Sequence, residues 1–512
     1  WRNGPLQDIA LEQMAAMKKF HELDIPHSGF YAEGAGATFF GEYKKEELYK
    51  VVSFGERHGF KVFSWQFPNM TQELAQELLP ECPKEELPIT RNKNDEEEKL
   101  PVYIDFSHPR AKELLAAQWK DRMDAGIRGS MVDFGDVVPD EAVFYDGRRG
   151  DEMHNAYAYQ YAKNYRELFE QKYGDDHVLY TRGAAPGSQH FACQFGGDQL
   201  TSFQGLKYAI AGGLSAAASG LPFWGVDAGG YDGFPDQETY LRWTEYAAFC
   251  PLMRFHGTEP REPWEYDAFT VKVYRYYTWL RENLRPYIVS VAAEAHKLGI
   301  PMMRPLAMMY PEDQEATKVW DEYLFGEDLL VAPVSDETEE REIYFPEGRW
   351  ISLWNLNDEI SGPVQRSVEV PIDKIPVYIR EGSFLPLRLN ESLKLGESMS
   401  ESETEMILAV VPQNDSIVKE TLYERSGAKT CCGMEKNGET IQLQISGRTA
   451  ELYVMLAGMH WKNTEAIVNG RRLTKVTARE GLYFTEGYLE LEEGILVKIN
   501  PSAESVIKIQ KK

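Results

Sequence analysis

The first 300 residues repeat one pattern, and this repetition restricts the fold more than any other feature of the chain. An amphipathic stretch comes first, a Gly or Asp follows it, and a short apolar run comes next. The stretch from Ala111 to Met123 spaces its apolar residues by about 3.6 positions, which is the helical period, and "IRGSMVDF" follows it. A helix followed by a buried strand, repeated along the chain, favours a parallel sheet with helices on its faces.

Six apolar runs are candidate strands of this sheet. They are "HSGFYAEG", "KVFSWQFP", "IRGSMVDF", "DHVLYTRG", "HFACQFGGD" and "LPFWGVDAGG". Six strands over about 250 residues predict a closed (β/α)8 TIM barrel rather than an open doubly wound sheet. The glycine-rich stretch "GAGATFFG" at 34–41 lacks the third spaced glycine of a dinucleotide-binding fingerprint, which also favours the barrel.

The texture of the sequence changes near residue 300. Short apolar runs divided by Gly, Pro and charged residues follow, as in "REIYFPEGRWISLW", and this texture is typical of antiparallel sandwich strands. A second block of the same texture begins after "SLKLGESMSESETE". We therefore expect an α/β chain with a (β/α)8 barrel over residues 1–300. Two C-terminal antiparallel β-sandwich domains should follow, a proximal one over 301–392 and a distal one over 393–512.

The composition restricts the partners of the chain. The formal net charge of −26 argues against binding nucleic acid or an anionic membrane, because both attract clustered Lys and Arg. The five cysteines form no C-x-x-C pair, so neither a disulfide framework nor a zinc site is indicated. The longest uncharged run, Tyr208 to Val226, contains Gly220 and Pro222 and predicts a buried helix and strand. We expect a cytoplasmic protein with a neutral small-molecule ligand. Assembly into a homo-oligomer is left open.

Polar residues follow the predicted strands at positions where a barrel gathers its functional groups. They are Glu33, Trp65, Asp133, Arg182, Asp198, Asp227 and His256. Carboxylates and an arginine hydrogen-bond hydroxyl groups, and aromatic rings stack on sugar faces, so this set suits a neutral polyhydroxylated ligand. Cleavage of a glycoside needs two carboxyl groups with different tasks, and four acids provide a choice of pairs. Taken alone, Asp133 would also fit a turn residue at a strand end.

Several motifs, in a fixed order, carry a resemblance to a known family. They are "MVDFGDVVP", "DGRRGDEMHNAYAYQYAKNYRELF", "TRGAAPGSQHFACQFGGDQ", "GLPFWGVDAGGY" and "PLMRFHGTEPREPWEY". Together they resemble the family 31 glycoside hydrolases, in particular the α-xylosidase and α-glucosidase branches. The resemblance extends over roughly residues 1–390. It implies a (β/α)8 barrel with proximal and distal C-terminal β-sandwiches. The implied activity is exo-acting and retaining, on α-linked sugars, without a metal or cofactor.

The resemblance also implies roles for individual residues. Asp133 matches the family's nucleophile and Asp198 matches its acid/base. The other matches are sugar-binding positions, which are Arg182, Asp227 and His256, and positions lining the same subsite, which are Glu33, Trp65, Phe195 and Tyr231. Retention of configuration requires the two catalytic carboxyl groups to lie about 5–5.5 Å apart.

The chain also departs from the family's pattern. Glu33 stands where the family usually has Asp, and Asp136 replaces the Glu that usually follows the nucleophile. Asp136 lies beyond Gly135, so we expect it to act as a supporting hydrogen-bond partner. The family's N-terminal β-sandwich and first barrel strand are not recognisable in the sequence. Either the sequence is a fragment of a longer chain, which we favour, or its N-terminal part has diverged beyond recognition. Other functions stay open at this point: a transglycosylase with the same site, an inactive carbohydrate-binding homologue, and a metal-dependent lyase or isomerase. The sugar itself could be glucose, xylose, galactose or a modified hexose.

Overall fold

The computed structural model describes residues 6–32, 45–91, 102–399, 404–448 and 450–512. The chain divides into two compact units. Unit 1 comprises Trp1–Gly197 and Phe223–Gly225, and unit 2 comprises Asp198–Pro222 and Val226–Lys512. Each unit is described by itself.

Unit 1 contains a six-stranded sheet in the order β1-β2-β5-β6-β7-β8, in which every neighbouring pair runs parallel. Its strands are β1 (Gly29–Tyr31), β2 (Lys61–Gln66), β5 (Gly129–Val132), β6 (Val178–Thr181), β7 (Cys193–Phe195) and β8 (Trp224–Gly225). Each lies within one of the six apolar runs of the sequence, so the prediction of six parallel strands is confirmed. Because all six run in one direction, their carboxyl ends lie at one edge of the sheet.

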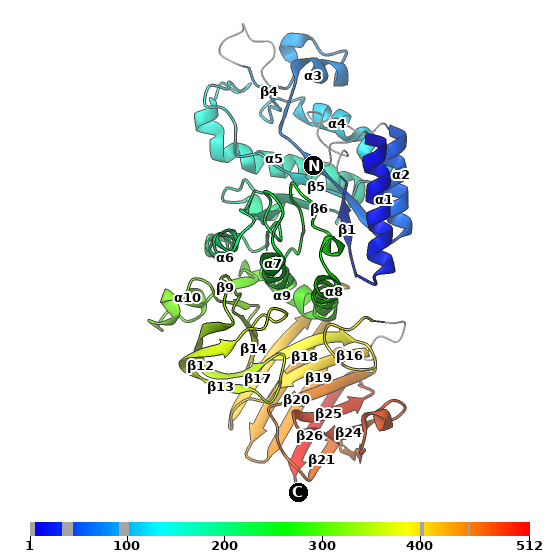
Figure 1. Cartoon of the computed structure of the whole chain (residues 1–512), viewed down its shortest axis with the longest axis vertical. Helices are drawn as coiled ribbons and strands as arrows, with labels where there is room; N and C mark the ends of the chain where they lie inside the picture. Colours follow the sequence, from blue (N-terminus) through cyan, green and yellow to red (C-terminus); the bar gives the residue numbers. More distant parts are fainter. Residues whose placement is uncertain (1–5, 33–44, 92–101, 400–403, 449) are drawn as a thin grey trace. The chain divides into compact units, whose positions relative to one another are not determined.

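Helices alternate with these strands along unit 1. They are α1 (Leu6–Glu22), α2 (Lys45–Arg57), α3 (Gln72–Leu78), α4 (Ala111–Ala125) and α5 (Gly150–Tyr173), and a small ladder joins β3 (Asn69–Met70) to β4 (Val102–Tyr103). Figure 1 shows α1 and α2 side by side, and α5 packs on β5 and β6. The predicted helix from Ala111 is α4, and its Trp119 lies fully buried against Tyr165 and Phe169 of α5. Aromatic rings therefore make up much of the core behind β5.

Unit 2 begins with helices. They are α6 (Phe203–Ala218), α7 (Gln237–Ala248), α8 (Ala268–Asn283), α9 (Arg285–Leu298) and α10 (Leu306–Met309). The uncharged run from Tyr208 to Val226 is the second part of α6 followed by β8, as the sequence predicts. Among the described residues, no helix is both long and apolar enough to cross a membrane.

Three antiparallel-rich sheets complete unit 2. The first has the order β13-β12-β14-β11-β10-β9, the second β15-β16-β20-β25-β24-β23 and the third β17-β18-β19-β26-β21-β22. The first comprises β9 (Met303–Pro305), β10 (Tyr323–Phe325), β11 (Leu329–Val331), β12 (Glu340–Ser352), β13 (Glu359–Glu369) and β14 (Val377–Arg380). The second comprises β15 (Phe384–Leu389), β16 (Thr404–Val410), β20 (Leu452–Ala457), β23 (Thr474–Lys475), β24 (Gly487–Glu490) and β25 (Gly494–Ile499). The third comprises β17 (Ser416–Tyr423), β18 (Lys429–Asn437), β19 (Thr440–Ser446), β21 (Thr464–Val468), β22 (Arg471–Arg472) and β26 (Glu504–Lys511).

The second and third sheets share one hydrophobic core, which includes Phe384 and Leu456 from one sheet and Leu443 and Ile507 from the other. The first sheet has a core of its own around Trp350. The change of texture near residue 300 therefore marks the start of the β-rich part of the chain. The layout as two sandwich domains with boundaries at 300 and 392 stays a prediction.

His27 precedes β1 and lies in an unusual setting for an ionisable side chain. Its ring stacks on Phe60, with the centroids 3.4 Å apart and an interplanar angle of 5°. Its Nδ1 is buried without a hydrogen-bond partner among the described residues. Burial lowers the pKa of His27 to about 4, and the neighbouring imidazoles of His21 and His58 add to this effect. The folded state therefore favours the neutral imidazole.

We expect His27 to make the folded state sensitive to mild acid. Above pH 6.5 the imidazole is neutral in both states, whereas between pH 6.5 and 4 only the unfolded chain takes up the proton. Solvent screening limits the resulting loss in unfolding free energy to about 1–2 kcal/mol at pH 4.5. His27→Phe keeps a ring against Phe60 and should remove this loss, measured by chemical denaturation at pH 7.5 and 4.5. His154→Gln, a control on the surface of α5, should keep the loss in unfolding free energy between pH 7.5 and 4.5. An equal loss in His27→Phe and the parent chain would contradict the prediction.

Candidate active-site residues

Asp133 follows directly after β5, and its side chain is held by neighbours from two strands. Its backbone N–H donates to the carbonyl of Gln66 at 3.0 Å. Trp65 Nε1 donates to its Oδ2 at 3.0 Å, and the backbone N–H of Phe134 donates to its Oδ1 at 2.9 Å. The residue is only 5% exposed. Each carboxylate oxygen thus accepts a hydrogen bond, which stabilises the charged form.

Helix α5 fixes the backbone around Asp133. Tyr161 Oη donates at 3.1 Å to the same Gln66 carbonyl that accepts the Asp133 N–H. A Cβ atom on Gly135 would lie 2.8 Å from the Tyr161 ring, so only glycine lets the chain pass this close to α5. Phe134 between them has a φ of 57°, a left-handed conformation that is strained for an aromatic residue. Such strain persists only where the surroundings determine the backbone, so the carboxylate of Asp133 has little freedom.

Arg182, which follows β6, lies between two carboxylates. Its Nε donates a hydrogen bond to Oδ1 of Asp136 at 3.2 Å. The same Nε lies 3.6 Å from Oδ1 of Asp133. Its guanidinium carbon lies 4.0 Å from the centroid of the Phe134 ring. The prediction that Asp136 is a supporting hydrogen-bond partner is confirmed, and its partner is Arg182. One positive charge thus neutralises part of the negative charge beside Asp133.

Two predicted lining residues are aromatic side chains of unit 1. Trp65 lies in β2, and its ring centroid is 4.1 Å from that of Phe67. Phe195 ends β7, is 2% exposed, and packs edge-on against Tyr180 with centroids 6.0 Å apart. Trp65 therefore combines packing in the sheet with its hydrogen bond to Asp133. For Phe195 the structure describes packing, and contact with a sugar stays a prediction.

Asp198 and Asp227 belong to unit 2, on two segments that hydrogen bonds join. Asp198 is exposed, and Gln199 follows it. The Tyr231 N–H donates a hydrogen bond to the backbone carbonyl of Gln199 at 2.8 Å. Its side-chain Oε1 accepts the Asp227 N–H at 3.2 Å. A β-bridge links Leu200 to Asp232 one step further along. The segment of Asp198 and the loop that carries Asp227 and Tyr231 therefore form one connected structure.

Gly230 allows these two segments to approach. A Cβ atom at this position would lie 2.5 Å from the Cα of Thr201 and 2.6 Å from the carbonyl oxygen of Leu200. Its φ of 79° is also in the left-handed region that favours glycine. The second glycine of the "AGG" after Asp227 is thus required by packing.

Asp227 and His256 share the neighbour Arg254. The Asp227 side chain is fully buried and forms an ion pair with the Arg254 guanidinium, while the Ala228 N–H donates to the Arg254 carbonyl at 3.0 Å. Burial, with the positive charge of Arg254, lowers the pKa of His256 well below 6.5. A neutral imidazole can donate one hydrogen bond and accept another. The His256 ring lies 5.4 Å from that of Tyr231.

Sequence reasoning missed two arginines. Arg254 lies two residues before His256, and only this proximity could have drawn attention to it. Arg261 is 6% exposed, and its guanidinium donates to the carbonyls of Gly230 at 2.8 Å and Gly233 at 2.6 Å. It also donates to the carbonyl of Tyr231 at 3.1 Å. Nothing in the sequence around Arg261 predicts this role, because its acceptors are backbone atoms of a distant loop.

The predicted residues therefore fall into two groups. The first, in unit 1, is Trp65, Asp133, Arg182 and Phe195, and the second, in unit 2, is Asp198, Asp227, Tyr231 and His256. Glu33 lies outside the described residues. The described part of the chain contains no group of three His, Cys, Asp or Glu that could hold a metal ion.

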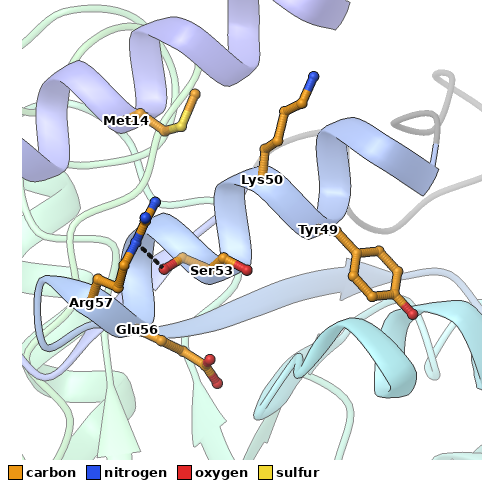
Figure 2. Close-up of a pocket in the computed structure, with 6 residues that line it drawn as sticks. All are labelled: Met14, Tyr49, Lys50, Ser53, Glu56 and Arg57. Atoms are coloured by element: carbon orange, nitrogen blue, oxygen red, sulfur yellow. Dashed lines mark hydrogen bonds between the residues drawn. The ribbon is translucent and has the colours of Figure 1, made fainter.

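A surface hollow in unit 1 lies apart from these residues in the sequence. Figure 2 shows its lining, which comes from one residue of α1, Met14, and from several of α2, among them Ser53 and Glu56. Arg57 Nε donates to the Ser53 carbonyl at 3.2 Å within it. Among the predicted catalytic and sugar-binding residues that the structure describes, none lines this hollow.

Known proteins resemble the chain over most of its length. The sequence profile of the glycosyl hydrolases family 31 TIM-barrel domain matches residues 10–291, and that of the glycosyl hydrolase family 31 C-terminal domain matches 299–385. An isomaltosyltransferase from Sporosarcina globispora is 32% identical over an alignment of 430 residues that covers 79% of this chain and 39% of that protein. An alpha-xylosidase from Emericella nidulans is 32% identical over 56% of this chain and 38% of its own.

A solved structure also matches the fold. The cycloalternan-forming enzyme from Listeria monocytogenes, in complex with a pentasaccharide substrate, aligns with a TM-score of 0.88 at 22% identity. The alignment covers 98% of this chain and 53% of that enzyme. This chain thus spans about two fifths of the length of the curated relatives described above. The matched profiles, which cover the TIM-barrel and C-terminal domains, show that the chain belongs to glycoside hydrolase family 31.

Proposed function

We propose that the chain is an exo-acting, retaining α-glycosidase that hydrolyses terminal α-linked sugars of the glucose, xylose or galactose type. The observation that carries this proposal is the setting of Asp133. Its carboxylate is nearly buried, accepts hydrogen bonds from Trp65 and Phe134, and has Arg182 beside it. These contacts favour an ionised carboxylate with a fixed orientation, which is what a nucleophile at an anomeric carbon requires.

The proposed mechanism is a double displacement. A carboxylate oxygen of Asp133 bonds to the anomeric carbon while the bond from that carbon to the leaving oxygen breaks, and Asp198 gives its proton to the leaving oxygen. Asp198 then takes a proton from water, and the resulting hydroxide attacks the anomeric carbon. The bond to Asp133 breaks, so the sugar is released with its original configuration.

The remaining predicted residues are proposed to bind the sugar. The Asp227–Arg254 pair, the neutral His256 imidazole and Tyr231 offer donors and acceptors for hydroxyl groups. Glu33, Trp65, Arg182 and Phe195 are proposed to complete the same subsite. We also propose that residues 1–300 form the catalytic barrel and that sandwich domains occupy 301–392 and 393–512. No step of this mechanism uses a metal ion or cofactor.

A panel of p-nitrophenyl α-glycosides tests the reaction and identifies the sugar. Release of p-nitrophenol from one α-glycoside, at equal rates with and without EDTA, would support a metal-independent glycosidase. NMR of the first product should show the α-anomer. A lack of turnover across the panel would favour an inactive carbohydrate-binding homologue, and a first product in the β-form would contradict retention.

A second candidate is transfer of the sugar to another sugar instead of water. One relative is named as an isomaltosyltransferase, and it is similar to 79% of this chain. Both reactions share the first displacement and differ only in the acceptor that attacks the glycosyl–enzyme ester. Product analysis at increasing acceptor concentration separates them, because a transferase forms oligosaccharides at the expense of free sugar.

Removal of Asp133 should abolish turnover. We expect Asp133→Ala to retain less than about 1% of the wild-type rate, since loss of a nucleophile costs several orders of magnitude. Azide should restore part of the turnover of an α-glycosyl fluoride, because it can attack the anomeric carbon from the vacated side, expel fluoride and leave a β-glycosyl azide. Asp136→Asn, which keeps the nucleophile, should retain more activity than Asp133→Ala. A rate above about 1% in Asp133→Ala without azide would contradict the assignment.

Loss of the hydrogen bond from the Trp65 indole should slow the attack of Asp133 on the anomeric carbon. Trp65→Phe keeps a ring beside Phe67 but removes the hydrogen bond to Asp133 Oδ2. A hydrogen bond to a charged group contributes about 1.5–3 kcal/mol, so kcat/KM should fall by about ten- to a hundredfold. Trp354→Phe is a matched control, since it removes the indole hydrogen bond to the Ile375 carbonyl in the β-rich part of the chain. An equal effect of both substitutions would show that the loss reflects stability.

A further inference from the structure

Phe234 is an exposed aromatic residue on the loop that follows Asp227. Its side chain is 48% exposed. One face of its ring stacks on Tyr266, with centroids 4.9 Å apart and an interplanar angle of 22°. Tyr266 stacks in turn on the fully buried Tyr240, at 4.7 Å and 27°. Phe234 is therefore the outer end of a column of rings that extends from the core of unit 2 to solvent.

Hydrogen bonds hold this column and its loop in place. Tyr266 Oη donates to the Pro235 carbonyl at 2.8 Å, and Tyr240 Oη donates to the Arg261 carbonyl at 2.7 Å. Arg261 donates to the Gly233 carbonyl directly before Phe234, and Thr258 Oγ1 accepts the Gly233 N–H at 2.9 Å. The exposed ring is thus fixed before any ligand arrives, so little conformational entropy would be lost on binding.

The same loop connects Phe234 to the segment of Asp198. The β-bridge joins Leu200, two residues after Asp198, to Asp232, two residues before Phe234. At about 3.5 Å per residue, each of these two-residue steps spans at most about 7 Å. Leu200 is itself 54% exposed. An apolar side chain and an aromatic ring therefore lie exposed at the segment that carries the proposed proton donor.

We propose that Phe234 is a stacking platform for the sugar on the leaving-group side of the scissile bond, and for an acceptor sugar in a transfer reaction. Aromatic faces pack against the C–H faces of pyranose rings, which are neutral and so suit this acidic chain. The donor of a proton to the leaving oxygen must lie beside the leaving sugar, which assigns the Asp198 segment to that side. The inference rests on the proposed function. It adds a specificity-determining residue, Phe234, for the sugar beyond the cleaved bond.

The test compares substrates with and without a leaving sugar. The α-glycosyl fluoride of the sugar that the p-nitrophenyl panel identifies has no leaving sugar, whereas an α-linked trisaccharide that ends in the same sugar does. In Phe234→Ala the ratio of kcat/KM for the trisaccharide to that for the fluoride should fall by about three- to tenfold, mainly through KM. Phe234→Trp should keep the ratio at or above that of the wild type. Phe484→Ala is the matched control, since Phe484 is 93% exposed in the distal β-rich region and should leave the ratio unchanged.

The possible failures are distinguishable. A wild-type chain that turns over neither the fluoride nor any aryl α-glycoside would overturn the proposed function, and the inference with it. A wild-type chain that turns over both substrates, with the same ratio in Phe234→Ala, would overturn the inference alone. An equal loss on both substrates together with a lower melting temperature would show that the ring only stabilises the loop, and would also overturn it.

Discussion

The arrangement of unit 1 depends on one constraint, which is that its six strands run parallel in register. Trp65 is paired with Met131 and Gln66 with Val132, so the residue after Val132 emerges beside the end of β2. Asp133 therefore donates its N–H to Gln66 and accepts the indole N–H of Trp65. A shift of one residue in this register would turn the Trp65 side chain to the other face of the sheet and remove the contact. The orientation of the proposed nucleophile is thus a consequence of backbone pairing.

In unit 2 a buried arginine, Arg261, holds the backbone beside the proposed site residues, as strand pairing does in unit 1. The loop after Asp227 is rich in glycine and turns sharply, and several of its carbonyl groups accept hydrogen bonds from outside the loop. Arg261 donates to three of them, those of Gly230, Tyr231 and Gly233. Burying a guanidinium is unfavourable unless its N–H groups are satisfied, and unpaired buried carbonyls are unfavourable too. Each group therefore offsets the cost of the other, and the loop that carries Asp227 and Tyr231 takes a single shape.

Strand pairing organises unit 1, whereas arginine contacts organise the loop of unit 2, and this difference explains which parts of the structure the sequence could predict. The strands of unit 1 are predictable because apolar runs alternate with amphipathic helices. Asp133 and Arg182 are predictable because they directly follow strands, and Asp136 because it lies in the loop after Asp133. Arg254 and Arg261 were missed, because their partners are a buried acid and backbone carbonyls of another segment, which leave no periodic signal. The boundaries between the β-rich parts are weakly marked for a related reason, since short apolar runs divided by Gly, Pro and charged residues recur throughout residues 301–512.

The departure at position 136 has a physical compensation nearby. The family usually carries Glu there, and the shorter Asp136 still reaches Arg182 at 3.2 Å. Gly183 follows Arg182, and a Cβ atom on it would lie 3.2 Å from the Asp136 backbone nitrogen and 3.2 Å from its Cβ. The absence of a side chain at 183 lets the two segments approach, which matches the loss of one methylene at 136. Arg182 thereby stays between Asp136 and Asp133, and a larger residue at 183 would weaken the hold of Asp136 on the guanidinium.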